Sequence, residues 1–107
     1  MARAKAFYET LLQEKLELME LRPVQYALFS VEDRFNCGAL AQGEGYEPSA
    51  QGVTVYLDGG EDLESRLARA QKAGGTAIMP KTYLGKEAGH IGLFLDSEAN
   101  RIGLQSP

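Results

Sequence analysis

Few side chains in this sequence could carry out chemistry, and each has a plainer interpretation. The chain has one histidine, His90, and one cysteine, Cys37, which excludes an internal disulfide, a multi-histidine metal site and a cysteine-rich zinc cluster. No base can be placed beside Cys37, so we interpret it as a small apolar residue. The glycine-rich stretches Gly43–Gly45 and Gly59–Gly60 lack the spacing and the lysine of a phosphate-binding loop and are predicted to be turns. The sequence therefore assigns no catalytic residue.

Composition limits the class of protein further. A chain of 107 residues with 44% hydrophobic and 24% charged residues is the size and composition of one globular domain. A net charge of −4 argues against a sequence-independent nucleic-acid binder, which usually carries a basic patch. No apolar stretch follows the basic amino terminus, and no run of about 18 apolar residues occurs. We therefore expect no nucleic-acid partner, no membrane span and a cytoplasmic location.

The first half of the sequence predicts one helix followed by strands. Ala4, Phe7 and Leu11 recur at the spacing that lines one face of a helix. Pro23 then interrupts an extended pattern, because proline cannot donate to a strand ladder. Three strands are predicted, at residues 16–21, 24–31 and 37–41.

The second half begins after a glycine-containing linker at 42–52 and predicts a strand, a helix and three more strands. Asp62 is placed to cap the helix through its side-chain oxygen, and Gly74 is placed to end it. Pro80 is expected to stop the strand that follows the helix, with a loop at 83–89. The strands of this half are predicted at residues 53–57, 76–79, 90–95 and 101–104.

The order of elements indicates a duplication. Each half resembles a βαβββ unit, and the first copy lacks its opening strand. The pattern predicts an α+β fold of paired units. A ferredoxin-like βαββαβ arrangement is the rival, but three consecutive strands after each helix do not suit it.

Four segments resemble the vicinal oxygen chelate superfamily, which includes glyoxalase I, bleomycin-resistance proteins and extradiol dioxygenases. Ala4–Glu9 is similar to the signature of its first helix, and Asp62–Gly75 resembles its second helix. Met79–Thr82 is similar to the turn that follows in the glyoxalase-related branch. Phe94–Leu104 resembles the closing hairpin, written F-x-D-P-E-G-N-R-I-x-L. Ser97 and Ala99 depart from the usual proline and glycine.

This resemblance implies paired βαβββ modules, the glyoxalase/bleomycin-resistance/dioxygenase fold, with the two sheets lining a shared cavity. The 107 residues would form a single glyoxalase-like domain. Module one would span about residues 1–42 and lack the first strand, and module two would span about 52–107.

The resemblance also bears on metal binding. Metal-dependent members hold a divalent cation with histidine, glutamine and glutamate side chains spread over four strands. One ligand would come from the absent strand, another falls on Gly52 or Thr54, and the last falls on Gly103. We therefore expect no metal site of the family type and no cofactor.

Strand alternation gives a prediction for the cavity. It assigns Val53, Val55 and Leu57 to the helix-covered side of their strand, and it assigns Ile91, Leu93 and Leu95 to the same side of theirs. The residues left facing the cavity are the predicted ligand-binding set, namely Thr54, Tyr56, His90, Phe94 and Arg101. A cavity lined in this way suits a small, partly apolar molecule. The plainer interpretation of the two aromatic residues is packing.

Three functions remain open at this stage. The first is binding of a small, partly apolar molecule without a metal. The second is a metal-dependent lyase, isomerase or dioxygenase whose first metal-ligand strand is absent from this chain. The third is a non-catalytic module that dimerises. Because the family's first strand sits beside the fourth, residues 37–41 are expected to form an uncovered sheet edge, so we predict a homodimer, with exchange of modules as one arrangement.

Overall fold

The structure, a computed structural model, describes residues 1–29 and 38–107. The end of the strand predicted at 24–31 and the start of the strand predicted at 37–41, with Cys37, lie outside these residues. The first unit contains α1 (Ala2–Leu12), β1 (Glu17–Leu21), β2 (Val24–Leu28) and β3 (Ala39–Gln42). The second unit contains β4 (Val55–Asp58), α2 (Leu63–Lys72), β5 (Thr76–Gly85), β6 (Gly89–Leu95) and β7 (Arg101–Ser106). Neither helix in this part of the chain is long and apolar enough to cross a bilayer.

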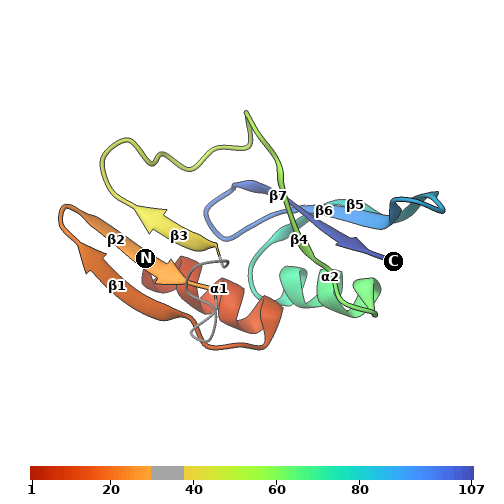
Figure 1. Cartoon of the computed structure of the whole chain (residues 1–107), viewed down its shortest axis with the longest axis horizontal. Helices are drawn as coiled ribbons and strands as arrows, with labels where there is room; N and C mark the ends of the chain where they lie inside the picture. Colours follow the sequence, from red (N-terminus) through yellow and green to blue (C-terminus); the bar gives the residue numbers. More distant parts are fainter. Residues whose placement is uncertain (30–37) are drawn as a thin grey trace.

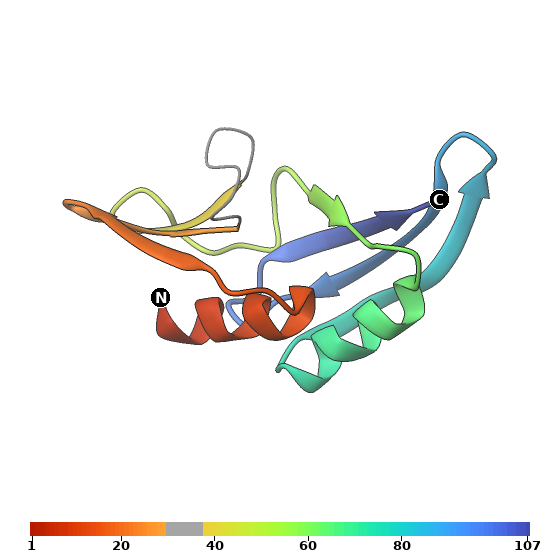
Figure 2. The same cartoon turned by 60° about the horizontal axis from the view of Figure 1, so that its bottom comes forward.

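The strands form two sheets, and both helices lie on the same side of them (Figures 1 and 2). The first sheet is antiparallel with the order β1-β2-β3. The second has the order β4-β7-β6-β5, in which β4 runs parallel to β7 and the other pairs are antiparallel. The elements α1-β1-β2-β3 therefore repeat α2-β5-β6-β7, and among the described residues β4 has no counterpart in the first unit. The predicted α+β fold is confirmed.

Helix α2 begins and ends where the sequence predicts. The Asp62 carboxylate accepts a hydrogen bond from the backbone N–H of Ser65 at 3.2 Å, which satisfies one of the unpaired donors of the first turn. Arg69 and Lys72 lie in the last turn, where cations interact favourably with the helix dipole. Gly74 follows with φ +108°, a conformation that glycine adopts without strain.

Strand β5 differs from its prediction. It continues through Pro80 to Gly85 instead of ending at Met79, so the loop predicted at 83–89 is shorter. Strand β5 is the last strand of its sheet, and an edge strand tolerates a proline whose nitrogen faces away from the neighbour. The pairing with β6 shifts register between Met79 and Thr82, which accommodates the irregularity.

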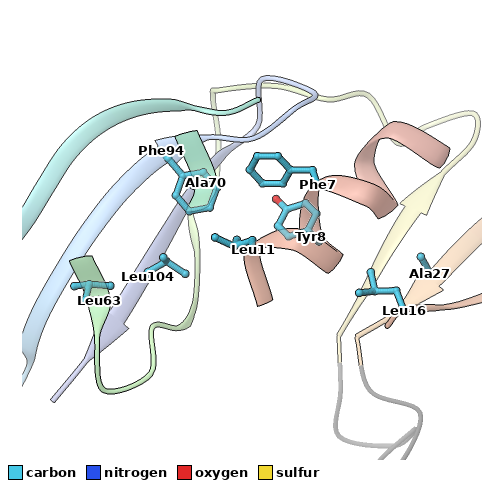
Figure 3. Packing of buried hydrophobic residues seen from close by; sticks show 9 residues of the cluster. All are labelled: Phe7, Tyr8, Leu11, Leu16, Ala27, Leu63, Ala70, Phe94 and Leu104. Atoms are coloured by element: carbon cyan, nitrogen blue, oxygen red, sulfur yellow. The ribbon is translucent and has the colours of Figure 1, made fainter. Parts of the chain in front are cut away.

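The two units share one hydrophobic core beneath the helices (Figure 3). Phe7 of α1 packs against Phe94 of β6 with ring centroids 5.9 Å apart. Tyr8 and Leu11 of α1 are at most 2% exposed. The remaining buried members of the cluster are Leu16, Ala27, Leu63, Ala70 and Leu104. Helix α1 therefore packs on the second unit as well as on its own sheet.

Polar contacts reinforce this junction between the units. The Tyr8 hydroxyl donates to the Asp96 carboxylate at 2.5 Å, between buried groups. Arg3 donates two hydrogen bonds of 2.7 Å to Glu98, and the Arg69 side chain donates to the carbonyl of Leu11 at 3.1 Å. Helix α1 is thus held both to the turn between β6 and β7 and to α2.

Replacing Tyr8 with phenylalanine should destabilise the chain strongly. Tyr8→Phe keeps the ring in the core and removes only the hydrogen bond to Asp96. Because this bond ends on a buried carboxylate, we expect a loss of about 1.5–3 kcal/mol in the free energy of unfolding. Urea denaturation measures it, with Tyr83→Phe as the control because Tyr83 is 61% exposed. Equal losses in the two variants would contradict the structural role of this bond.

The Arg3–Glu98 pair should make stability depend on acid pH. The Arg3 guanidinium lowers the pKa of Glu98 from 4.5 to about 2. As the pH falls, Glu98 is protonated in the unfolded chain before it is protonated in the folded chain. The contribution of the pair to the free energy of unfolding is therefore complete above pH 4.5 and is lost as the pH falls toward 2. Glu98→Gln should flatten the dependence of the unfolding free energy on pH over that window. Added salt should reduce the difference, because Arg3 is 76% exposed; identical pH profiles for variant and parent would refute the assignment.

Candidate ligand-binding face

We call the side of the second sheet that is turned away from the helices the open face. A Cβ at Gly92 would collide with Leu67 of α2, so Gly92 faces the helix. A Cβ at Gly103 would collide with the Tyr56 ring, and Leu104 lies in the core, so Gly103 and Tyr56 face the opposite way. These contacts fix which side chains of each strand belong to the open face.

Strand register arranges the open face in rows that cross the sheet. Tyr56 stands opposite Gly103, Gly103 opposite Leu93, and Leu93 opposite Met79. The Tyr56 ring therefore lies over a glycine backbone and beside an apolar strip. Leu93 is buried, whereas Tyr56 remains 45% exposed. The result is an aromatic surface supported from below by the sheet.

Polar side chains flank this row. Gln105 pairs with Ile91 on one side, and Arg101 pairs with Leu95 on the other. Thr54 lies one residue before the start of β4. The open face thus combines one aromatic ring with a cation and an amide.

A shallow depression of about 490 Å³ lies at one end of this face, a volume within the range of ligand pockets. Tyr56 and Gln105 line it together with Lys86 and Glu87 of the turn between β5 and β6 and the terminal Pro107. The Gln105 side chain donates to the carbonyl of Ala88 at 2.9 Å, which ties that turn to β7. The ligand-binding prediction from sequence did not include Gln105, Lys86 or Glu87, although strand alternation places Gln105 on this face.

The structure places the five residues of the predicted set in different environments. Tyr56 and Arg101 share the open face, and Thr54 lies one residue before β4. Phe94 is 1% exposed and packs on Phe7 beneath the helices, so the predicted assignment of faces on β6 is wrong.

His90 shares the strand face of Phe94 by alternation. Its Nδ1 lies 3.0 Å from the Pro107 carbonyl oxygen, and its ring lies 5.1 Å from that of Tyr83. These are local structural contacts away from the Tyr56 row. Leu93 and Ile91, expected under the helix, lie on the open face instead.

The side chains present do not fit the family's metal site. Within residues 1–29 and 38–107, no group of three histidine, cysteine, aspartate or glutamate side chains converges on one point. Two of the family's ligand positions fall on Gly103 and on Gly52 or Thr54, and neither glycine nor a lone threonine hydroxyl supplies the donors that such a cation requires.

A second depression, of about 540 Å³, lies between α1 and the first sheet. Two of its polar side chains, Lys5 and Glu9, are paired with each other. Glu9 accepts hydrogen bonds from Lys5 at 3.0 Å and from the backbone N–H of Leu16 at 2.8 Å, and the bond from Leu16 is the main cause that lowers the pKa of Glu9. These contacts tie the end of α1 to the start of the first sheet, so we assign this region a structural role.

The Tyr56 ring and the backbone at Gly103 should be energetically coupled. Gly103→Ala introduces a methyl group where the ring lies, and we expect a loss of about 1–3 kcal/mol in the free energy of unfolding. In a Tyr56→Ala background the same change should cost clearly less, because the obstructing ring is gone. Chemical denaturation of the two single variants and the double variant measures this coupling, and additive losses would contradict the stacking of Tyr56 on Gly103.

Comparison with known proteins gives similarity in structure only. No family model and no curated protein matches this chain. A glyoxalase/bleomycin resistance protein from Albidiferax ferrireducens superposes with a TM-score of 0.67 at 15% identity, over 100% of this chain and 90% of that one. Glyoxalase I from Zea mays gives a TM-score of 0.67 at 18% identity, over 98% of this chain but only 41% of the maize chain. A hypothetical protein from S. aureus gives 0.66 at 12% identity, over 100% and 88% of the two chains.

These superpositions cover both units of the chain. They confirm the predicted fold. The chain has the glyoxalase/bleomycin-resistance/dioxygenase fold.

Proposed function

We propose that this protein binds a small, partly apolar organic molecule on the open face, over the ring of Tyr56. The observation that carries the proposal is the position of that ring, which rests on Gly103 and stays 45% exposed. An aromatic ring with its lower face packed and its upper face in water is already ordered for stacking. A ligand therefore gains contact area without the cost of ordering a mobile side chain.

The flanking side chains suggest the polar part of the ligand. Arg101 lies two residues along β7 from Gly103, a separation of about 7 Å along a strand. It is exposed and would reach an anionic group on a molecule stacked on Tyr56. Gln105 lies the same distance away in the other direction. A molecule with a flat apolar body and one acidic or hydrogen-bonding end fits this row.

The alternative of a metal-dependent lyase, isomerase or dioxygenase has less support. It requires a ligand set that the described residues do not bring together. The names of the structural relatives include both a bleomycin resistance protein and a glyoxalase I, so similarity in fold does not choose between binding and catalysis. The choice rests on the side chains of the open face.

Anilinonaphthalene sulfonate, a fluorescent dye with an aromatic body and one anionic group, is a suitable probe. We expect a saturable rise in its fluorescence with the folded protein. Tyr56→Ala should weaken binding about fivefold to tenfold, because an aromatic contact contributes about 1 kcal/mol. Arg101→Gln should weaken it further through loss of the charge.

Tyr83→Ala is the matched control for this titration. It removes a tyrosine that is also exposed but that contacts His90 away from the Tyr56 row, so its affinity should stay within about twofold of the parent. Non-saturable fluorescence, or equal weakening by the two tyrosine variants, would refute binding over Tyr56. Thermal melts with and without the dye give an independent reading, since a ligand of the native state raises the melting temperature.

A further inference from the structure

The depression at the end of the open face is lined by charged side chains as well as by Tyr56. Building on the binding proposed over Tyr56, we propose that the same ligand is an aromatic amine whose positively charged nitrogen lies in this depression. The side chains that carry the proposal are those of Asp58, Gln105 and Glu87, which supply acceptors of hydrogen bonds and negative charge.

Asp58 brings a carboxylate to the open face. It ends β4, two residues after Tyr56, and it stands opposite Gln105 of β7. Because side chains alternate along a strand, Asp58 shares the face of Tyr56 and lies about 7 Å from it along the strand. Its Oδ1 accepts a hydrogen bond from the backbone N–H of Gly60 at 2.9 Å. This bond orients the carboxylate and leaves Oδ2 available to a ligand.

Gln105 supplies a second acceptor beside Asp58. Its Nε2 donates to the carbonyl of Ala88 at 2.9 Å, so Oε1 is the amide atom that remains for a ligand. An amide oxygen can only accept hydrogen bonds. Because neighbouring strands lie about 4.8 Å apart, one nitrogen with several N–H donors can bond to Asp58 and Gln105 together.

The turn between β5 and β6 adds Glu87 and Lys86 to the depression. It is held close to β7, since a Cβ at Gly89 would collide with the Ser106 carbonyl. Within residues 1–29 and 38–107, the ion pairs are Arg3–Glu98 and Lys5–Glu9. The charges of the depression are therefore not neutralised by ion pairs in that part of the chain.

The balance of these charges favours a cation. Two carboxylates, Asp58 and Glu87, stand against one ammonium group, Lys86. A ligand ammonium group has three donors and no acceptor, which matches Asp58, Gln105 and Glu87. The exposed ring of Tyr56 also attracts a cation placed over its face.

The cation of Arg101 lies too far away to oppose the ligand nitrogen. Arg101 is four residues from Gln105 along β7, a separation of about 13 Å, which exceeds the Debye length of about 8 Å at physiological salt. The ligand class that fits is therefore an arylalkylamine, with its ring on Tyr56 and its nitrogen at Asp58.

The test compares tryptamine with tryptophol, which carry the same indole and two-carbon chain and end in an ammonium group and a hydroxyl group. The chain has no tryptophan, so indole fluorescence comes from the probe alone, and its anisotropy reports binding to the whole folded chain. We expect tryptamine to bind about threefold to fivefold more tightly than tryptophol. Added salt should reduce this difference.

Three variants separate the charges. Asp58→Asn keeps the acceptor for Gly60 and removes the charge, so it should weaken tryptamine about threefold to fivefold and leave tryptophol within about twofold. Glu14→Gln is the matched control, because it removes the same charge from an exposed residue of the first unit, and it should leave both affinities unchanged. Lys86→Gln should leave tryptamine binding unchanged or tighter, since it removes a like charge. Circular dichroism verifies that each variant folds.

Equal affinity for the two indoles, equal effects of Asp58→Asn and Glu14→Gln, or weakening of tryptamine by Lys86→Gln would each overturn the ammonium site. Absence of binding by both indoles would overturn it as well. The dye titration with Tyr56→Ala tests binding over Tyr56 by itself. Dye binding that depends on Tyr56, together with no preference for tryptamine, would therefore overturn the ammonium site and leave the proposed function standing.

Discussion

The structure depends on the anchoring of α1 to the second unit through Tyr8. Its hydroxyl donates to Asp96 in the turn after β6, and Asp96 in turn accepts from the backbone N–H groups of Glu98 and Asn100 at 2.9 Å. Burial and the hydrogen bond to Asp96 both raise the pKa of Tyr8, which keeps the hydroxyl protonated and able to donate. Because a buried donor without a partner costs free energy, α1 is held where this bond is made. Both helices then lie on one side of the sheets, and the other side stays open.

The packing of the helices on one side of the sheets determines which side chains of β6 face the helices. The sequence alone left this assignment open. Both alternating sets on this strand are compatible with burial: one holds Ile91, Leu93 and Leu95, and the other holds Gly92 and Phe94. Counting apolar residues favours the first set for the helix side, which is the wrong choice. The close approach of Leu67 leaves room only for a glycine at position 92. Such a contact between α2 and β6 is tertiary and leaves no trace in local periodicity.

Features governed by neighbouring residues were predictable from the sequence, whereas those governed by neighbouring strands were not. The order of elements and the cap at Asp62 follow from local backbone chemistry and agree with the structure. The length of β5 does not, because a proline ends an interior strand but is tolerated on an edge. The same division holds for the site. Strand alternation predicts the position of Tyr56 at the candidate ligand site. It does not predict Lys86 and Glu87, which line the same depression because Gln105 holds their turn against β7.

The two units repeat one helix and three strands, and among the described residues they differ in β4, which only the second unit has. In the second unit β4 covers the edge of β7 and also brings Tyr56 over Gly103, so one strand both completes the sheet and furnishes the aromatic part of the open face. The described first unit has neither a strand at that position nor an aromatic ring brought by one. The ring on which the proposed ligand site depends is therefore supplied by the second unit.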